Sequence, residues 1–444
     1  MHVGSLSSRW RRPAIAAVLL LVFLSYTPTA IDDWREARGY EYEWVAWSLA
    51  QGHGYSFDGG TAWLGPYGPP SEYSRTAWIE PIQTSIMALC FHSFDENGRL
   101  VLVLLNALWL TLTALTVFLI VERLAGSISA LTSAILFGAL SSYEGSPLLY
   151  IGNAALAGFI ISSIALVMIH VMERPSLSAC VVLGVVLGVG ALTHAGTLLA
   201  IPLAYCVIVF AVGCRRRESW RYAGVAVLVA GLMLAPWTVR NLSVFGELVP
   251  VRTGSGFNAY IGNPGLGRTI EPGLRDGDTQ SPPLWTAKDP REALWKLKDL
   301  NLDRALRWHS LSTIQENSSD GYSEYNEAQR DRVFRERALE FVGEEFWLAV
   351  RMAIWKVIAF YGYWGWPFRV ITVMAFLGLL LRVRDARAAA IVLLLAAYTL
   401  PYAVSLPLYY RYRFPVEPLL VVMSGLLLGS TIDLVNRSLR SHWR

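Results

Sequence analysis

Acidic side chains gather in the polar segment that follows the first long apolar stretch of the chain. They are Asp32, Asp33, Glu36, Glu41, Glu43, Glu72 and Glu80. A carboxylate that is partly withdrawn from water, with its pKa raised, suits the removal of a proton from an acceptor hydroxyl, as inverting glycosyl transfer requires. Any one of these acids can equally be a solvated loop residue. Asp32 and Asp33 are favoured because they directly follow the apolar stretch, at the level where a lipid-borne sugar would be presented.

Basic side chains lie beside other apolar stretches and offer the complementary chemistry. Arg240 follows one stretch in LAPWTVRN, Arg411 and Arg413 precede another in LYYRYRFPVEP, and Arg75 and His53 lie in the first polar segment. Arginine donors at a membrane interface stabilise the negative charge that grows on a phosphate when a sugar leaves it. An arginine beside a span more often just extends toward lipid headgroups. Arg411 and Arg413 are better candidates because they are expected on the outer side, against the usual distribution of positive charge.

Several other chemistries have no support in the sequence. No two histidines or cysteines stand at metal-ligand spacing, so a protein-built metal site is not expected, and dependence on a divalent cation is left open. The absence of a Walker-type or Rossmann glycine pattern and of a basic cytoplasmic domain argues against nucleotide hydrolysis, a nucleotide-sugar fold and nucleic-acid binding. His194, at the end of an apolar stretch in ALTHAG, is expected to pack or cap a helix rather than bind a ligand.

The composition places the chain in a membrane. Its 444 residues are 54% hydrophobic and only 16% charged, with a mean hydropathy of +0.39. A soluble domain carries about 25% charged residues and has no single core large enough to hide so much apolar surface. Apolar runs long enough to cross the hydrocarbon layer recur along the chain. The sequence therefore predicts an all-α polytopic membrane protein.

About ten spans are expected, and basic residues in the short links orient them. Arg9, Arg11 and Arg12 predict a cytoplasmic N-terminus, with the first span kept as an anchor rather than removed as a signal peptide. An even number of spans then places the C-terminal tail and the other arginine-containing links on the cytoplasmic side. The predicted spans are residues 14–31, 100–121, 128–143, 153–172, 177–193, 196–213, 221–239, 367–381, 386–406 and 415–435.

Residues 346–363 form a further apolar run that we interpret differently. A crossing here would move the RVRDAR link to the outer side. Arg351 and Lys356 lie within the run, and each would cost about 2.5 kcal/mol or more at the bilayer centre. We therefore expect an amphipathic helix on the outer interface.

Three parts of the chain follow from this topology. Residues 1–239 hold seven spans and a first extracytoplasmic loop, 32–99. Residues 240–366 form a second, larger extracytoplasmic loop that ends with the interfacial helix. Residues 367–444 hold three more spans.

Three stretches of sequence resemble a known superfamily. The first is YEYEWVAWSLAQGHGYSF followed by TAWIEP, the second is LAPWTVRNLSVFGELVPVRTGSGFNAYIGNP, and the third is RYRFPVEP. In order and spacing they are similar to motifs of the bacterial C-type membrane glycosyltransferases related to the dolichyl-phosphate-mannose protein mannosyltransferases. The likeness extends over nearly the whole chain.

The resemblance implies a polyprenyl-phosphate sugar donor, an active site outside the bacterial cytoplasmic membrane and a first-loop acid as the base. Many relatives have an acid directly after the first span, which Asp32 or Asp33 matches. Others have a glutamate five residues before a helix alanine, which Glu41 matches, and the choice stays open. The residues taken as substrate-binding candidates are His53, Arg75, Glu80, Arg240, Asn263, Arg411 and Arg413.

One departure from the family concerns the fourth span. Many relatives have an acid at its start, where this chain reads YIGNAALAG. Either Glu144 in the preceding turn substitutes for that acid, or its function is missing.

Three functions are consistent with these features. The leading hypothesis is an enzyme that moves one sugar from a polyprenyl-phosphate carrier to an extracytoplasmic glycan, lipid or protein. The second is a transporter or flippase of lipid-linked glycans, which should place ionisable residues within its spans. The third is a scaffold of the same fold that binds lipid phosphate without turnover.

Overall fold

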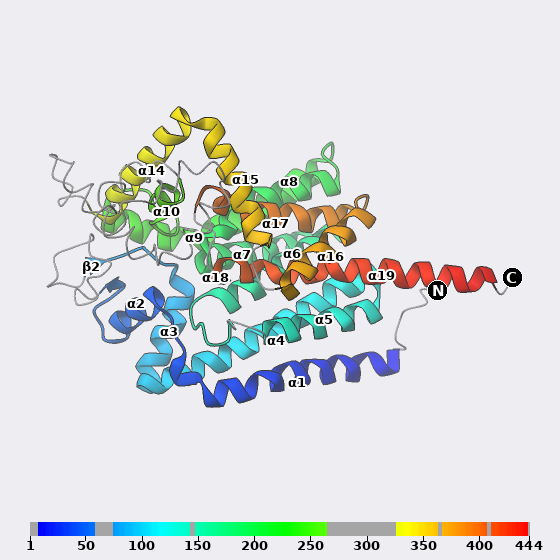
Figure 1. Ribbon diagram of the computed structural model, residues 1–444. Helices are drawn as coiled ribbons and strands as arrows, with labels where there is room; N and C mark the ends of the chain where they lie inside the picture. Colours follow the sequence, from blue (N-terminus) through cyan, green and yellow to red (C-terminus); the bar gives the residue numbers. More distant parts are fainter. Residues whose placement is uncertain are drawn as a thin grey trace, which may run out of the picture.

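The computed structural model of the chain describes residues 8–57, 74–142, 147–263, 326–362, 366–405 and 410–442. Within these ranges the chain is almost entirely helical (Figure 1). A short antiparallel pair, β1 (Ser56–Phe57) and β2 (Ser74–Arg75), places Ser56 opposite Arg75. Glu72 and Glu144 lie outside the described residues. The predicted all-α architecture is confirmed.

A bundle of apolar helices forms the body of the molecule, and each predicted span corresponds to one of them. They are α1 (Ser8–Asp32), α4 (Gly98–Ala125), α5 (Ser127–Ser141), α6 (Ala154–Glu173), α7 (Leu177–Thr193), α8 (Ala200–Val212), α9 (Arg217–Phe245), α16 (Trp366–Leu381), α17 (Ala386–Val404) and α19 (Glu417–His442). In the described part of the chain, seven helical stretches are long and apolar enough to cross a membrane, or eight if a bent pair ending in α16 is one span. The helices α5 and α7 are apolar but shorter.

Small residues let these helices approach closely, as is usual where lipid offers no hydrophobic drive for association. A Cβ atom on Gly184 of α7 would lie 2.5 Å from the carbonyl oxygen of Ala226 in α9. A Cβ atom on Gly378 of α16 would lie 2.1 Å from the carbonyl oxygen of Met423 in α19. Glycine is therefore required at both helix crossings.

The two ends of the bundle differ in what they carry. The helix α1 begins and α19 ends at the same end, which we call the terminus end (Figure 1). At this end Glu173 pairs with Arg387 at 3.0 Å and with Arg123 at 3.8 Å. These ion pairs join three of the links whose arginines were predicted to lie on the cytoplasmic side.

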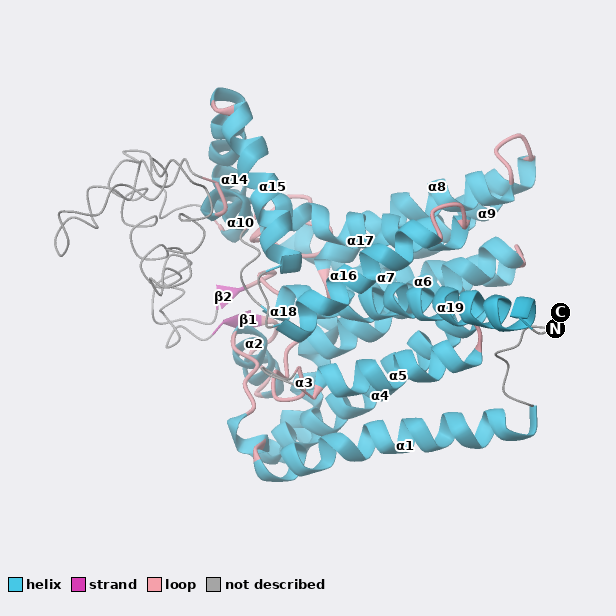
Figure 2. Cartoon of the chain, turned by 45° about the vertical axis from the view of Figure 1, so that its right-hand side comes forward, coloured by secondary structure: helices cyan, strands magenta, loops and turns pink. Residues whose placement is uncertain are grey.

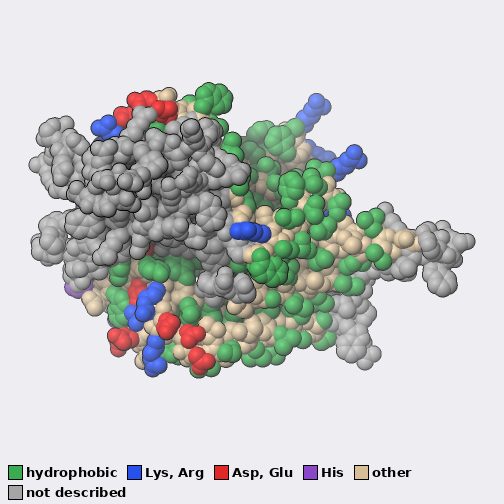
Figure 3. Space-filling model, in the orientation of Figure 1, with side chains coloured by type: hydrophobic (Ala, Val, Ile, Leu, Met, Phe, Trp, Pro, Cys, Tyr) green, Lys and Arg blue, Asp and Glu red, His purple; other side chains and the backbone are tan. Residues whose placement is uncertain are grey.

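The opposite end, which we call the loop end, carries elements from both predicted extracytoplasmic loops and from the links before α8 and α19 (Figure 2). Charged side chains gather near this end in Figure 3, whereas the flank of the bundle is largely hydrophobic. These elements are η1 (Trp34–Glu36), α2 (Glu41–Ala50), α3 (Pro81–Phe94), η3 (Asp95–Asn97), η4 (Ala195–Leu199), α10 (Ser255–Ile261), α14 (Glu327–Glu344), α18 (Tyr410–Arg413) and η7 (Phe414–Val416).

The described part of the first loop contains an apolar helix, α3, that the sequence analysis did not predict. Its helix α3 packs beside α2, with the rings of Trp47 and Phe91 stacked at 4.4 Å. The side chain of Glu43 fixes α2 to the start of α4 by accepting a hydrogen bond from Arg99 Nε at 2.9 Å. In the described part of this loop, α2 and α3 thus pack against each other at the loop end of the bundle.

The run predicted as an interfacial helix forms α15 (Phe346–Gly362). It crosses the bundle obliquely in Figures 1 and 2, and the chain then bends by 110° into α16. Ile354 and Ile358 are exposed on one face of α15, whereas the side chain of Lys356 is buried inside the protein. An amphipathic surface helix would expose this lysine, so the structure differs from the expectation in the direction of Lys356.

Candidate functional site

A buried carboxylate, Glu80, marks the point where three parts of the chain meet at the loop end. Glu80 precedes α3, whose first residue is Pro81, and its side chain is 1% exposed. The carboxylate accepts hydrogen bonds from the Ala195 backbone N–H at 2.9 Å and from the Tyr42 hydroxyl. Arg252 forms an ion pair with it at 3.4 Å. The first loop, the end of α7 and the second loop are therefore joined at one side chain.

The backbone around Glu80 is held as firmly as its side chain. The hydroxyl of Tyr55, near the end of the first-loop turn, donates to the Glu80 carbonyl oxygen at 3.0 Å. The Thr84 hydroxyl donates to the same carbonyl at 2.8 Å. This carboxylate is consequently fixed in position by the folded loop rather than free to move with substrate.

Surrounding charge determines the protonation of this cluster. Burial alone would raise the pKa of Glu80, but Arg252, His194, the Ala195 N–H and the Tyr42 hydroxyl together lower that pKa below its ordinary value. Burial and the neighbouring Glu80 charge raise the pKa of Tyr42 well above its usual range. Burial opposes the charge of Arg252, but Glu80 outweighs it and raises the pKa of the guanidinium. Glu80 and Arg252 therefore stay charged at neutral pH, and Tyr42 remains a donor.

His194 connects this cluster to α17. Its Nδ1 accepts a hydrogen bond from the Gly196 N–H at 3.2 Å and so caps η4, which confirms the expected capping role. Its Nε2 lies 3.1 Å from the Tyr398 hydroxyl and 3.3 Å from the Tyr402 hydroxyl. The Tyr398 hydroxyl also donates to the carbonyl oxygen of Tyr412 at 3.1 Å. We call Glu80, Arg252, Tyr42, His194, Tyr398 and Tyr402 the Glu80 cluster.

Two carboxylates of α14 bind the two loops to each other. Glu327 accepts hydrogen bonds from the Thr76 hydroxyl at 2.7 Å, from the Ala77 N–H at 2.9 Å and from the Thr253 hydroxyl. One turn later, Asp331 accepts from the N–H groups of Gly256 at 2.8 Å and Phe257 at 3.1 Å. Burial raises the pKa of both carboxyls, although these donors oppose it. Because these hydrogen-bond donors belong to the first and second loops, Glu327 and Asp331 hold the segment that contains Arg252 in place.

The three acids predicted as the base lie in different surroundings. Asp32 is the last residue of α1 and is exposed, and Asp33 precedes η1 and is half-buried. Glu41 opens α2, directly before Tyr42, and is 7% exposed. Among these three, only Glu41 is adjacent in sequence to a member of the Glu80 cluster, and only Glu41 is buried.

The cations predicted in the first loop and after the seventh span lie along one edge of the loop end. Arg240 donates to the backbone carbonyls of Thr76 at 2.7 Å and Tyr55 at 3.1 Å, so it holds the first loop against α9. Arg75 is exposed on β2, and His53 is exposed in the turn after α2. Arg240 thus has a structural task in addition to its predicted role in substrate binding.

The remaining predicted ligands lie nearer the C-terminal helices. Asn263 is buried, and its amide donates to the carbonyl oxygens of Ala259 and, at 3.3 Å, Val404. Arg413 is fully buried, pairs with Glu417 one turn later at 3.7 Å and donates to the Thr372 hydroxyl at 3.4 Å. Arg411 belongs to α18, and its side chain lies outside the described residues.

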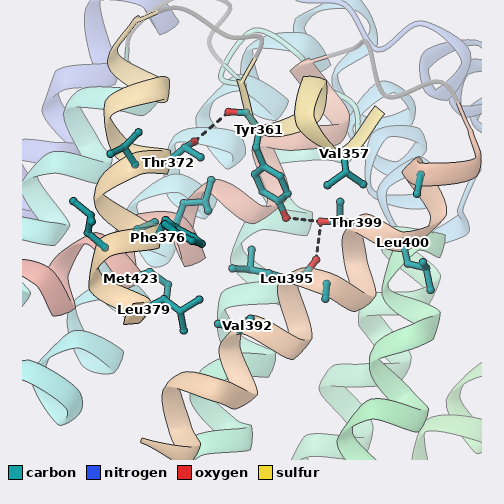
Figure 4. Close-up of a pocket in the computed structure, with 16 residues that line it drawn as sticks. Val357, Tyr361, Thr372, Phe376, Leu379, Val392, Leu395, Thr399, Leu400 and Met423 are labelled. Atoms are coloured by element: carbon teal, nitrogen blue, oxygen red, sulfur yellow. Dashed lines mark hydrogen bonds between the residues drawn. The ribbon is translucent and has the colours of Figure 1, made fainter. Parts of the chain in front are cut away.

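An apolar cavity of about 610 Å³ lies beside Arg413, between α15, α16, α17 and α19 (Figure 4). Its few polar groups gather at one end, where the Tyr361 and Thr399 hydroxyls are 2.6 Å apart and the Thr372 hydroxyl donates to the Tyr361 carbonyl oxygen at 3.2 Å. Four of its lining residues are large hydrophobic side chains exposed on the flank of the bundle: Val373, Phe376, Leu377 and Leu400. The cavity therefore opens toward the side that lipid would cover.

The helix α17 links the cavity to the Glu80 cluster. Leu395 and Thr399 line the cavity, whereas Tyr398 and Tyr402 face His194 on the other side of the same helix. Two environments of opposite character, one apolar and one charged, are thus separated by a single helix.

The sequence did not single out several members of the cluster. Tyr42 and Arg252 lie within the stretches that carry the family resemblance, but no role was predicted for either. The tyrosines of α17 had no motif at all. The one sequence signal that could have indicated Arg252 is its position in an outer loop, shortly after the end of a span.

A divalent cation finds no complete set of protein ligands in the part of the chain that the structure describes. No three histidine, cysteine, aspartate or glutamate side chains come together there in a way that could hold a metal ion. Cation dependence stays a prediction, and no step below relies on it.

Comparison with known proteins finds similarity in structure alone. No family model matches the chain, and no curated protein matches it in sequence. The oligosaccharyltransferase of Archaeoglobus fulgidus, tethered to an acceptor peptide containing the NVT sequon, aligns with a TM-score of 0.54 at 13% identity, over 97% of this chain and 51% of that chain. The same enzyme in complex with Zn and sulfate aligns with a TM-score of 0.51 at 14% identity, over 94% and 49%.

A further solved structure, ArnT from Cupriavidus metallidurans bound to undecaprenyl phosphate, aligns with a TM-score of 0.39 at 15% identity, over 96% of this chain and 79% of that chain. The chain spans about half the length of the archaeal oligosaccharyltransferase. The architecture shared with the oligosaccharyltransferase confirms the predicted fold: this is a polytopic membrane protein with a C-type glycosyltransferase fold.

Proposed function

We propose that the protein transfers a sugar from a polyprenyl-phosphate carrier to an acceptor outside the cytoplasmic membrane. The observation that carries the proposal is the arrangement around α17, where an apolar cavity open to the lipid side adjoins a buried charged cluster at the loop end. An isoprenoid chain needs the first environment and a phosphate sugar needs the second. The fold shared with an oligosaccharyltransferase supports the same class of reaction.

In this proposal Glu41 is the general base. Its carboxylate takes the proton from the acceptor hydroxyl as the hydroxyl oxygen bonds to the anomeric carbon. The bond between the anomeric carbon and the phosphate oxygen breaks, and its electron pair stays on the phosphate. Glu41 is preferred to Asp32 and Asp33 because it is buried and adjoins Tyr42 in the cluster.

Arg252 is the cation that we propose stabilises the leaving phosphate. Its side chain is 21% exposed, so it combines a fixed position on Glu80 with access from outside. A guanidinium held in this way can stabilise charge developing on the leaving phosphate without reorganising during the reaction. Tyr42 and the tyrosines of α17 add protonated hydroxyl groups around it.

Filling the cavity tests the part of the proposal that concerns the carrier. Ala396 lines the cavity on α17, and an Ala396→Trp variant should transfer sugar from a long-chain polyprenyl-phosphate donor at least about tenfold more slowly, because overpacking displaces the chain. A donor with only two isoprene units should be used nearly as well as by the wild type. Turnover of both donors by the protein in lipid measures this difference.

The matched control places the same bulk on the same helix away from the cavity. Leu393 is 48% exposed on α17 and does not line the cavity, so Leu393→Trp should leave the rate of sugar transfer from both donors unchanged. An equal loss for both donors in Ala396→Trp, or no loss for either, would show that the cavity does not hold the carrier.

A further inference from the structure

Lys356 is a buried cation for which the proposed reaction, as stated so far, has no use. It lies in α15, and its side chain is 1% exposed. Among the residues that the structure describes, no carboxylate pairs with its ammonium group and no acceptor forms a hydrogen bond with it. By contrast, the buried Arg413 has Glu417 one turn away.

The position of Lys356 on α15 is defined by its helical neighbours. Phe360, one turn later on the same face, stacks on Tyr402 of the Glu80 cluster at 5.3 Å. Val357 and Tyr361, on the adjoining face, line the apolar cavity. Residues four apart lie above one another on a helix, so Lys356 occupies the boundary between the cavity and the cluster.

A buried ammonium group without a counter-ion is strongly unfavourable, because the protein does not replace the water that it loses. A buried ionisable side chain that lacks a partner is therefore retained for a function more often than for stability. The missing partner must be an anion that can reach the place where the apolar cavity meets the charged cluster. A phosphate carried on an isoprenoid chain satisfies both conditions.

We propose that Lys356 binds a phosphate oxygen of the polyprenyl-phosphate carrier. This inference rests on the proposed function and adds a specific ligand to it. The lysine neutralises the carrier phosphate both before the sugar leaves and after, so it contributes to the binding of donor and product alike.

Binding of the product separates this role from catalysis. The probe is a C55 polyprenyl monophosphate, with the C55 polyprenol as its uncharged counterpart, and affinity is measured for the purified full-length protein in lipid nanodiscs. Lys356→Met keeps the length of the side chain without its charge and should weaken phosphate binding by at least about tenfold, with polyprenol binding unchanged. Lys356→Arg should bind the phosphate within about threefold of the wild type.

The control removes a positive charge at the other end of the bundle. Arg384 is exposed in the link between α16 and α17, and Arg384→Met should bind both probes as the wild type does. The unfolding temperature gives a second readout, because Lys356→Met removes an uncompensated buried charge. Without ligand this variant should unfold at a higher temperature than the wild type. Added polyprenyl phosphate should raise its unfolding temperature by less than it raises that of the wild type.

The outcomes distinguish failure of the Lys356 proposal from failure of the proposed function. Equal phosphate affinity in the wild type and Lys356→Met would overturn the role of Lys356 and leave the proposed function standing. A lower unfolding temperature for ligand-free Lys356→Met would show that the ammonium group stabilises the fold, and would also overturn the proposed role of Lys356. A wild-type protein that binds the polyprenol as tightly as the phosphate would contradict the proposed function, and the role of Lys356 with it.

Discussion

A Glu41→Gln variant is expected to lose sugar transfer by about 10²–10⁴-fold, the range that a positioned general base contributes. Glutamine keeps the size of the side chain and its hydrogen-bonding carbonyl, but it cannot take the proton from the acceptor. Donor binding should be retained, because the substitution leaves Arg252 and the cavity intact. Turnover and donor affinity, measured on the same preparation in lipid, separate these effects.

The controls for this variant are the other acids of the first loop. Asp32 is exposed at the end of α1, so Asp32→Asn should retain activity within a few-fold of the wild type. Asp33→Asn, in a half-buried position, should do the same. Full activity in Glu41→Gln together with loss in Asp32→Asn or Asp33→Asn would move the base to the membrane exit, as part of the family has it.

The second large effect concerns the ion pair at the centre of the cluster. Arg252→Met should lower the free energy of unfolding by about 3 kcal/mol or more, because it leaves the Glu80 carboxylate buried without its counter-ion. Glu80→Gln combined with Arg252→Met should recover much of this loss, since neither charge then remains. Chemical unfolding in detergent, monitored by circular dichroism, measures the single and the double variant against the wild type.

The dependence on pH follows from the same pair. The folded-state pKa of Glu80 is below its ordinary value, so its contribution to stability is present above the ordinary carboxyl pKa and is lost as the pH falls through the lowered pKa. Arg252→Met removes this contribution, so the difference between variant and wild type should shrink as the pH is lowered.

A surface ion pair provides the comparison for this loss. Arg337 and Glu340 form an exposed pair at 3.2 Å on α14, and Arg337→Met should cost less than about 1 kcal/mol. An Arg252→Met loss as small as this one would mean that the buried pair does not hold the loops together.

The membrane fold was predictable because its signals are long and repeated. Each predicted span became a helix of the bundle. The arginines in the links also predicted that the links containing Arg123 and Arg387 lie at the same end, where both arginines pair with Glu173. The exception was α3, an apolar helix within a segment expected to be a polar loop. Phe91 of α3 stacks on Trp47 of α2, a contact that hydropathy alone does not reveal.

The candidate site was predictable only in part. Family-like stretches located the loops that converge, and Glu41, Glu80 and Arg413 all proved to be buried at the loop end or beside the cavity. The pairing of Glu80 with Arg252 joins residues 172 positions apart, and no periodicity in one sequence encodes such a contact. The burial of Lys356 was likewise not predictable, because it depends on which face of α15 packs against α17.

The most direct test of the central claim is whether the purified wild-type protein in lipid releases sugar from a polyprenyl-phosphate donor. A panel of radiolabelled polyprenyl-phosphate sugars, offered with glycan, lipid and peptide acceptors from the cell envelope, would be assayed with Glu41→Gln as the matched inactive control. The account predicts that at least one donor yields labelled product and free polyprenyl phosphate with the wild type, and that the variant yields neither above background. Tight binding of these donors with no transfer to any acceptor would contradict it, and would identify a lipid-phosphate-binding scaffold or transporter of the same fold.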